Sequence, residues 1–376
     1  MDLDLSDEQR ALFETVNALL AKRYEPGARA ALMESELGWS RETWAQYADM
    51  GLLGLSIAEE YGGAGMGGDE LSVVMESCGR ALALEPYFAT AVLGAGLVTA
   101  AGTPQQRANI LPEVCAGRMV LTFASAEPGT GWSLSELATT ATPTAGGWRI
   151  RGQKIAVPAG DSADLLIVSA RIDGGGVGLF LVEGGDVQRD SYLTQDGFRA
   201  ADLLFSDAAG TLLGSPEDSV EAVAGVVDIA MIALCAETVG LMDRMLAMTL
   251  EYLGTREQFG RRLAQFQALQ FRATELLVAV EQSRSMLVLA RLALRRQDGA
   301  DRRQIIWAAK AHADRSARLV GQEAIQLHGG IGMTMEHPIG HYVKRATVIA
   351  RTFTRGIELV SEIGANGGLI RQSDYA

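Results

Sequence analysis

The region that decides the fold opens with Thr255-Arg256-Glu257-Gln258-Phe259-Gly260, followed by Phe266-Gln267, and it closes with Gln326-Leu327-His328-Gly329-Gly330-Ile331-Gly332-Met333. Between these ends lies a long helical pattern, with Arg and Glu on one face and Leu, Val, Met and Ala on the other. Arg offers a rigid fork of donors that suits a pyrophosphate, and paired glycines let a backbone approach a ligand with its N–H groups exposed. Each feature alone is common, but together they predict an extended cofactor that carries phosphate.

This pair of motifs resembles the acyl-CoA dehydrogenase family of FAD enzymes, and the resemblance covers nearly the whole chain. It is nearest to the small or partner subunit branch of that family, of the pimeloyl-CoA and sterol side-chain type. The resemblance implies that the Arg contacts the FAD pyrophosphate of a neighbouring subunit and that the other motif residues cover the rest of the adenine dinucleotide. The positions are Arg256, Phe259, Phe266, Gln267, Gln326, Gly329 and Gly330. Because these contacts cross a subunit boundary in the family, they also imply an oligomer.

Composition excludes several classes of protein. The chain has 376 residues, of which 48% are hydrophobic and 21% charged, as in an ordinary globular protein with a large core. Its net charge of −13 argues against a nucleic-acid surface, although a local Arg cluster can still bind an anion. The three cysteines are far apart in apolar contexts, which favours inert thiols in a reducing cytoplasm. The N-terminus does not resemble a signal peptide, and no apolar stretch is expected to span a membrane.

Periodicity predicts an α+β protein, mainly α, in three parts. Residues 1–118 form an N-terminal helical domain that starts at the N-cap sequence Ser6–Gln9 and includes helices near 69–83, 87–101 and 104–115. The glycine-rich stretch 59–68 lacks the βαβ context and lysine of a phosphate-binding loop, so it is interpreted as a flexible connector.

The period changes near Met119. Residues 119–215 contain short apolar runs separated by Gly, Pro, Asp and Thr, which predicts a small antiparallel β-domain with core strands at 165–168 and 178–182. Residues 216–376 then return to the helical period, with a break near 297–300, which predicts a four-helix bundle.

The half of the site that would hold the reactive flavin ring departs from the family pattern. The segment Phe123–Ser133 resembles the flavin strand that ends in Glu-Pro-x-x-Gly, but Ala126 stands where a Thr is usual. The segment Gly152–Pro158 resembles the second strand, but Ala156 replaces the Trp that packs on the ring and Pro158 replaces the Thr that bonds flavin N5. Proline offers no N–H donor. The ring contacts of the family are therefore largely missing.

The catalytic base of the family is also not evident. Removing the proton α to a thioester needs a carboxylate, but the two positions where the family keeps one hold Arg355 and Ala230. A guanidinium cannot accept the proton at neutral pH. Glu358 is a weak alternative base, and Asp228 is a candidate contact to CoA.

The four histidines predict no metal site. His337 and His341 are spaced like a helical ligand pair, but Pro338 interrupts the helix and no third ligand is present, so all four, with His312 and His328, are interpreted as loop and surface residues.

Three hypotheses follow. The first is an acyl-CoA dehydrogenase subunit that acts as the partner half of a hetero-oligomer, with an electron-transfer flavoprotein as the expected acceptor. The second is a self-sufficient FAD homo-oligomer that uses an unusual base such as Glu358 or Asp228. The third is a scaffold or binding protein that has lost flavin. A flavin-dependent oxygenase or oxidase on the same fold is a weaker possibility.

Overall fold

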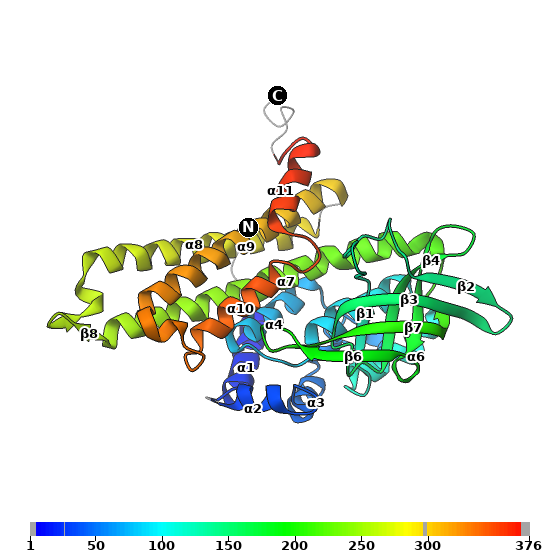
Figure 1. The fold of residues 1–376 in the computed structure, drawn as a ribbon, viewed down its shortest axis with the longest axis horizontal. Coiled ribbons are helices and arrows are strands. Elements are labelled where there is room, and N and C mark those ends of the chain that lie inside the picture. The colour runs from blue at the N-terminus through cyan, green and yellow to red at the C-terminus, as the bar shows by residue number, and fades with distance from the viewer. Residues whose placement is uncertain (1–4, 26, 296–298, 370–376) are drawn as a thin grey trace. The chain divides into compact units, whose positions relative to one another are not determined.

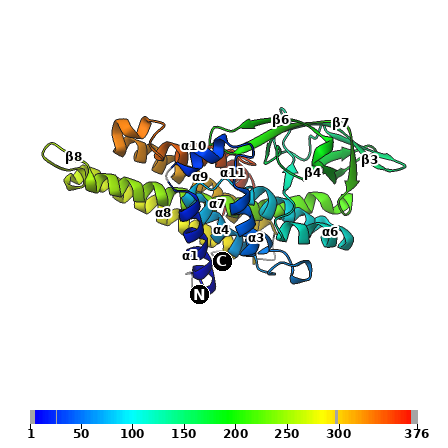
Figure 2. The same ribbon diagram turned by 90° about the horizontal axis from the view of Figure 1, so that it is seen from below.

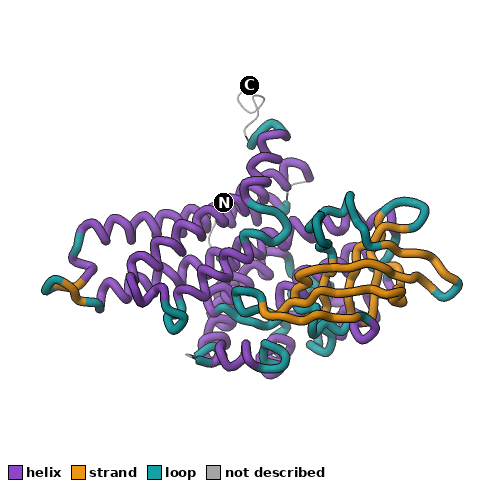
Figure 3. Tube along the Cα trace, viewed as in Figure 1, coloured by secondary structure: helices purple, strands orange, loops and turns teal. Residues whose placement is uncertain are grey.

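The computed structural model describes residues 5–25, 27–295 and 299–369. Most of the strands lie together in one group, and a short pair lies apart from it among helices (Figure 3). The α-helices are α1 (Asp7–Arg23), α2 (Ala28–Glu34), α3 (Arg41–Asp49), α4 (Gly68–Ala81), α5 (Ala95–Ala101), α6 (Pro104–Cys115), α7 (Pro216–Thr255), α8 (Gln267–Ala293), α9 (Gly299–His328), α10 (Ile339–Ile349) and α11 (Gly356–Ala365). The strands are β1 (Leu121–Ala124), β2 (Thr140–Thr144), β3 (Gly147–Pro158), β4 (Leu165–Ile172), β5 (Val177–Glu183), β6 (Gln188–Leu193), β7 (Arg199–Leu212), β8 (Glu257–Gln258) and β9 (Arg261–Arg262).

The chain divides into two compact units. The bundle unit consists of Met1–Tyr24, Ser72–Ala83 and Met231–Ala376, and the sheet unit consists of Glu25–Leu71 and Leu84–Ala230. The bundle unit therefore takes α1 and most of α4 from the N-terminal third of the chain. The boundaries at 118/119 and 215/216 mark where the sequence period changes, and as domain boundaries they stay a prediction.

The N-terminal helices begin where the capping residues predict. The Ser6 hydroxyl accepts the backbone N–H of Gln9, and the Gln9 side-chain oxygen accepts the backbone N–H of Ser6. Thr103 and Gln106 form the same pair of hydrogen bonds at the start of α6. The helix predicted over 87–101 is less regular than expected, because Phe88–Gly94 forms a π-helix before α5. Within it, the Thr90 hydroxyl bonds both the carbonyl and the N–H of Leu121, at the start of β1. The π-helix, whose turns are wider than those of an α-helix, thus contacts β1 through Thr90.

The central sheet is mixed, and so differs from the antiparallel domain predicted. β1 and β2 both pair with β4 in parallel, while β3, β5, β6 and β7 pair with their neighbours in antiparallel fashion. The pairings run from β4 through β2, β3, β7 and β5 back to β4, so they form a closed circuit. Strand direction was not readable from the sequence, because β1 and β2 reach β4 through long connections rather than tight hairpins.

The strands that could be predicted from the sequence are those whose side chains are buried. The predicted core runs at 165–168 and 178–182 lie in β4 and β5, and almost all of their residues are buried. β2 and β6 were not predicted, because most of their side chains are exposed or half-buried and no apolar alternation marks them.

The glycine-rich stretch 59–68 is not the flexible connector predicted. Backbone bonds from Ala64, Gly65 and Met66 return to residues 54, 57 and 55. A Cβ at Gly63 would lie 2.0 Å from the Ile57 carbonyl oxygen. The glycines allow a close backbone packing, which gives the stretch a defined structure.

Helix α7 is long and apolar enough to cross a membrane by length and composition, contrary to the sequence expectation that no stretch reaches this limit. However, 72% of its most apolar window is buried inside the protein. It packs against α4 at two glycines: a Cβ at Gly79 would lie 2.1 Å from the Glu237 carbonyl oxygen, and one at Gly240 would lie 2.0 Å from the Glu76 carbonyl oxygen. The apolar length of α7 is thus that of a core helix.

The C-terminal part contains three long helices, α7, α8 and α9, with the shorter α10 and α11 after them. Of the break predicted near 297–300, residues 297 and 298 lie outside the described part of the chain, and residues 299 and 300 already belong to α9. The β8–β9 hairpin joins α7 to α8 and lies toward the same end of the bundle unit as the C-terminal end of α9 (Figures 1 and 2).

Candidate functional site

The β8–β9 hairpin presents Arg256 and Phe259 to solvent. Its two turn residues, Phe259 and Gly260, have φ angles of +55° and +78°, which is the type I′ pattern of a tight hairpin. Phe259 is 90% exposed. A bulky residue at positive φ is strained, and a fully exposed Phe leaves its apolar surface in water. Backbone strain together with exposed apolar surface is characteristic of a residue that contacts a ligand or a partner protein.

The following segment builds an aromatic and cationic surface at the start of α8. The rings of Phe259 and Phe266 lie 6.2 Å apart, edge to face. The Arg261 guanidinium lies 4.0 Å from the centroid of Phe266, in a cation–π contact. Gln267 is the first residue of α8 and is exposed. Of the predicted residues, Phe259 and Gln267 are therefore exposed, and the half-buried Phe266 lies between them in sequence and contacts Phe259.

The glycine pair follows α9. Gln326 lies exposed in the last turn of this helix, and a short 3₁₀ turn over Gly329–Met333 follows it. Gly329 has a φ of +65°, and a Cβ on Gly329 or Gly330 would meet no atom within 4 Å. The turn thus exposes backbone at an open surface, as a bound phosphate requires. These features fit the dinucleotide half of FAD.

His328 is buried, which corrects its interpretation as a surface residue. It is 3% exposed, and its Nδ1 bonds the Ala324 carbonyl oxygen at 2.8 Å. His312, His337 and His341 are half-buried. Among the described residues, no group of three or more metal-ligating side chains is found. His337 and His341 therefore belong to no such group.

The strand that would hold the flavin ring lacks the means to do so. Ala156 lies in a bulge between β3 and β7, has a φ of +50° and is exposed. It supplies no ring to pack on a flavin. Pro158 has no N–H, and its carbonyl oxygen already accepts a hydrogen bond from the Thr122 hydroxyl at 2.6 Å. The residues present therefore do not fit the isoalloxazine ring.

The Glu-Pro motif is retained, but its carboxylate is structural. Glu127 and Lys154 form a buried ion pair of 2.7 Å, with side chains 1% and 0% exposed. Glu127 also accepts the N–H groups of Ala138 and Thr139. Burial alone would raise the pKa of Glu127, but the hydrogen bonds from Lys154, Thr139 and Ala138 outweigh it and hold the pKa below its usual range. This carboxylate fixes the strand and is not available as a base.

Arg355 and Glu358, the pair at the first base position, engage each other. Glu358 accepts the Arg355 backbone N–H at 3.0 Å and its Nε at 2.8 Å, which caps the start of α11. These hydrogen bonds to Arg355 lower the pKa of Glu358. A carboxylate committed to a cap with a lowered pKa is a weak proton acceptor.

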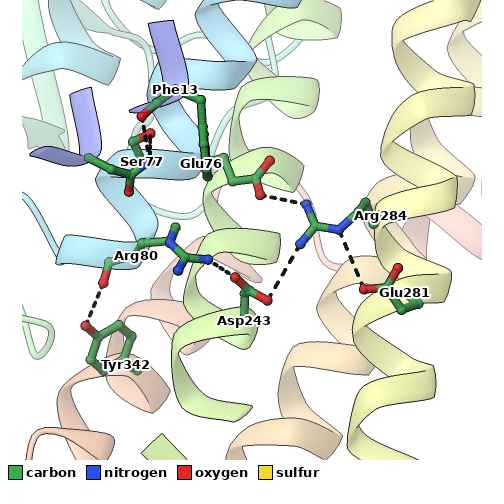
Figure 4. Close-up of polar contacts among 9 residues, drawn as sticks. Phe13, Glu76, Ser77, Arg80, Asp243, Glu281, Arg284 and Tyr342 are labelled. Carbon is green, nitrogen blue, oxygen red and sulfur yellow. Dashed lines mark hydrogen bonds and ion pairs between the residues drawn. The ribbon is translucent and has the colours of Figure 1, made fainter. Parts of the chain in front are cut away.

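The second base position offers no carboxylate to solvent. Ala230 is fully buried and Asp228 is 2% exposed. Within the bundle unit, Glu76 of α4 and Asp243 of α7 belong to a charged cluster (Figure 4). Arg284 contacts Glu76 at 2.7 Å and Asp243 at 3.7 Å, and Arg80 bonds Asp243. Glu237 is likewise paired with Arg345 at 2.5 Å. These acids hold helices together.

Comparison with known proteins agrees with this fold and this arrangement of residues. Three family models match successive parts of the chain: the acyl-CoA dehydrogenase N-terminal domain at residues 6–118, the middle domain at 122–207 and the C-terminal domain at 221–353. The chain belongs to the acyl-CoA dehydrogenase family, whose enzymes are FAD-dependent oxidoreductases that act on CH–CH bonds.

Several relatives match this chain over nearly its whole length. It is 30% identical to acyl-CoA dehydrogenase IpdE2 of Mycolicibacterium smegmatis over 91% of this chain and 93% of that protein. Among solved structures, a variant of the steroid acyl-CoA dehydrogenase Tcur3481–Tcur3483 is 31% identical with a TM-score of 0.87, covering 96% of this chain and 97% of that one. The ChsE4–ChsE5 complex from Mycobacterium tuberculosis is 27% identical with a TM-score of 0.87, covering 97% and 98%.

Proposed function

We propose that this chain is the partner subunit of a heteromeric acyl-CoA dehydrogenase. It would supply the contacts to the dinucleotide tail of an FAD, while a second family member supplies the ring pocket and the catalytic carboxylate. The observation that carries the proposal is a contrast between two halves of one site. Arg256, Phe259 and the Gly329–Gly330 turn are exposed and unobstructed, whereas Ala156 and Pro158 cannot hold a flavin ring.

The exposed motif supports binding across a subunit boundary. Phe259 and Met333 are 90% and 76% exposed, and Met335 is 66% exposed. Exposed apolar side chains beside an Arg are favoured at interfaces, where they become buried together with the ligand. Two of the similar structures named above, Tcur3481–Tcur3483 and ChsE4–ChsE5, bear the names of two subunits.

A bound FAD would supply the hydride acceptor for the α,β-dehydrogenation of an acyl-CoA, and a carboxylate of the second subunit would remove the α-proton. This chain would bind and orient the pyrophosphate through Arg256 and cover the adenosine end through Phe266, Gln267 and the Gln326–Gly330 turn. We further propose a bulky sterol side-chain or dicarboxylyl thioester as the substrate, an electron-transfer flavoprotein as the acceptor, and the cytoplasm as the location. Asp228 as a contact to CoA stays a prediction.

The self-sufficient homo-oligomer is less well supported. It needs a base, and Glu358 is bound into the cap of α11 while Asp228 is 2% exposed. The scaffold hypothesis, without flavin, remains an outcome of the experiment below.

The test is to count FAD per polypeptide in two samples, the chain purified alone and the chain co-expressed with another acyl-CoA dehydrogenase from the same source. We expect little FAD alone and one FAD per pair of chains in the complex. Arg256→Ala should lower the retained FAD about tenfold or more, since a charge-assisted bidentate contact is lost. Arg10→Ala, at an exposed position on α1, is the matched control. One FAD per chain in a homo-oligomer would refute the proposal, and no FAD in any complex would favour a scaffold.

A further inference from the structure

Three rings from distant parts of the bundle unit pack against one another as a cluster, the Tyr252–His328–His337 stack, in which the first pair is stacked and the second pair is tilted. His328, at the end of α9, lies with its ring centroid 4.7 Å from that of Tyr252 at an interplanar angle of 28°. On the same imidazole, the ring of His337 lies at 4.5 Å with an angle of 55°. The three residues come from the last turn of α7, the last turn of α9 and the segment before α10.

Two ring contacts and one hydrogen bond constrain the His328 ring. Its Nδ1 donates to the Ala324 carbonyl oxygen, while Nε2 is buried and has no hydrogen-bond partner among the described residues. His337 is itself oriented, because its Nδ1 accepts the N–H of Ile339 at 3.3 Å. A buried imidazole with one hydrogen bond and two ring contacts is positioned by that bond and by those rings.

The backbones of Tyr252 and His328 connect directly to the two parts of the proposed dinucleotide motif. The Tyr252 carbonyl oxygen accepts the N–H of Arg256 at 2.9 Å, and the Arg256 carbonyl oxygen accepts the N–H of Leu263 at 2.9 Å. His328 directly precedes Gly329, and a Cβ on Gly332 would lie 3.0 Å from the His328 Cβ. The turn therefore folds back onto His328, while the hairpin is fixed to Tyr252.

We propose that the Tyr252–His328–His337 stack is a positioning element that sets the distance between Arg256 and the Gly329–Gly330 turn, so that both reach one FAD at once. The inference rests on the proposed function, because it assumes that both parts bind the same dinucleotide. The sequence suggested each part but not what connects them.

The experiment uses the co-expressed complex and measures the dissociation constant of FAD from the quenching of its fluorescence, with urea unfolding as a check of folding. Tyr252→Leu and His328→Ala should each weaken FAD binding about tenfold, because a small displacement of a binding group is costly. Tyr252→Phe keeps the ring and should bind FAD as the native chain does. His312→Ala, a half-buried histidine sixteen residues earlier in α9, is the matched control.

A double-mutant cycle separates positioning from general structural support. In the Arg256→Ala background, His328→Ala should weaken FAD binding less than about threefold further, because the group whose position it sets is gone. Equal fold-changes in both backgrounds, or unchanged binding in a folded His328→Ala complex, would overturn the inference.

Conservative variants cover the case in which His328→Ala does not fold. His328→Phe keeps the stack and loses the hydrogen bond, and His328→Asn does the reverse. We expect the Phe variant to retain FAD better, and the opposite order would contradict positioning by stacking. If Arg256→Ala itself leaves FAD binding unchanged, the proposed function fails, which is a different result from failure of the stack alone.

Discussion

At the scale of single residues, the motif carries its ligand-binding groups at the surface, and the ring-binding strand keeps only its internal support. Lys154 donates to the Ser125 carbonyl oxygen, the Ser169 hydroxyl and Glu127, and it is completely buried. Such a pair persists for structural reasons even where the surrounding residues no longer fit a flavin ring, since breaking it leaves a buried charge unpaired.

The buried ion pair gives a prediction about stability. Lys154→Met should lower the free energy of unfolding by about 3–5 kcal/mol, because Glu127 is left charged and buried. Lys154→Met combined with Glu127→Gln should cost less than the single change, since the amide keeps an acceptor for Ala138 and Thr139 without the charge. Urea unfolding of the three variants measures both values.

The control is Arg118→Met, which breaks an ion pair with Glu113 whose side chains are 62% and 39% exposed. It should change stability little. A double variant of Lys154 and Glu127 that is less stable than Lys154→Met alone would contradict this account.

At the scale of elements, α4 and α7 meet through glycine rather than through side chains. The Gly79 and Gly240 positions leave no room for a Cβ, because backbone carbonyl oxygens of the facing helix lie about 2 Å from where it would be. The charged cluster around Arg80 and Arg284 then joins α4, α7 and α8 beside this contact (Figure 4).

This close approach predicts opposite effects of Ala at two glycines of α7. Gly240→Ala should destabilise the protein by about 1–3 kcal/mol, because α4 and α7 must move apart. Gly225→Ala should stabilise it by up to about 1 kcal/mol, since a Cβ there would meet nothing within 4 Å and Ala favours a helix. Thermal unfolding of both variants tests the prediction, and equal changes at the two positions would show that the helix contact does not determine the effect.

Prediction from sequence succeeded for elements that carry a local signal. The N-cap sequence at Ser6 predicted the start of α1 because a cap is formed within one turn, and the apolar runs in β4 and β5 predicted buried strands. The parallel pairing of β1 and β2 with β4, and the stack that joins Tyr252 to His328 and His337, left no such signal. They depend on residues that are far apart in the chain.

At the scale of the whole molecule, charge acts in two opposing ways. The chain carries −13 overall, which repels an anion such as FAD, but Arg256, Arg261 and Arg262 are all exposed on the hairpin. Short-range attraction should win at the pyrophosphate, because repulsion by distant surface charges is screened within about 10 Å at ordinary salt.

Salt dependence measures which of the two effects dominates. Raising NaCl from about 50 to 500 mM should weaken binding of FAD to the complex about fivefold, as exposed ion pairs are screened. The effect should be smaller in Arg256→Ala. If salt instead tightened binding, repulsion by the net charge would outweigh attraction by the hairpin arginines.

The family and the order of helical and strand regions could be read from the sequence, because caps, periodicity and short motifs are local properties of the chain. The residues that would contact a dinucleotide stay a prediction from the same motifs. It also showed that Ala156, Pro158, Ala230 and Arg355 stand where ring contacts and a base are usual. Only the tertiary structure decided that Glu358 caps a helix, that Glu127 is neutralised by Lys154, and that His328 is buried in a ring stack. The physical reason is that burial and partner choice are set by neighbours in space, which the linear order of residues does not specify.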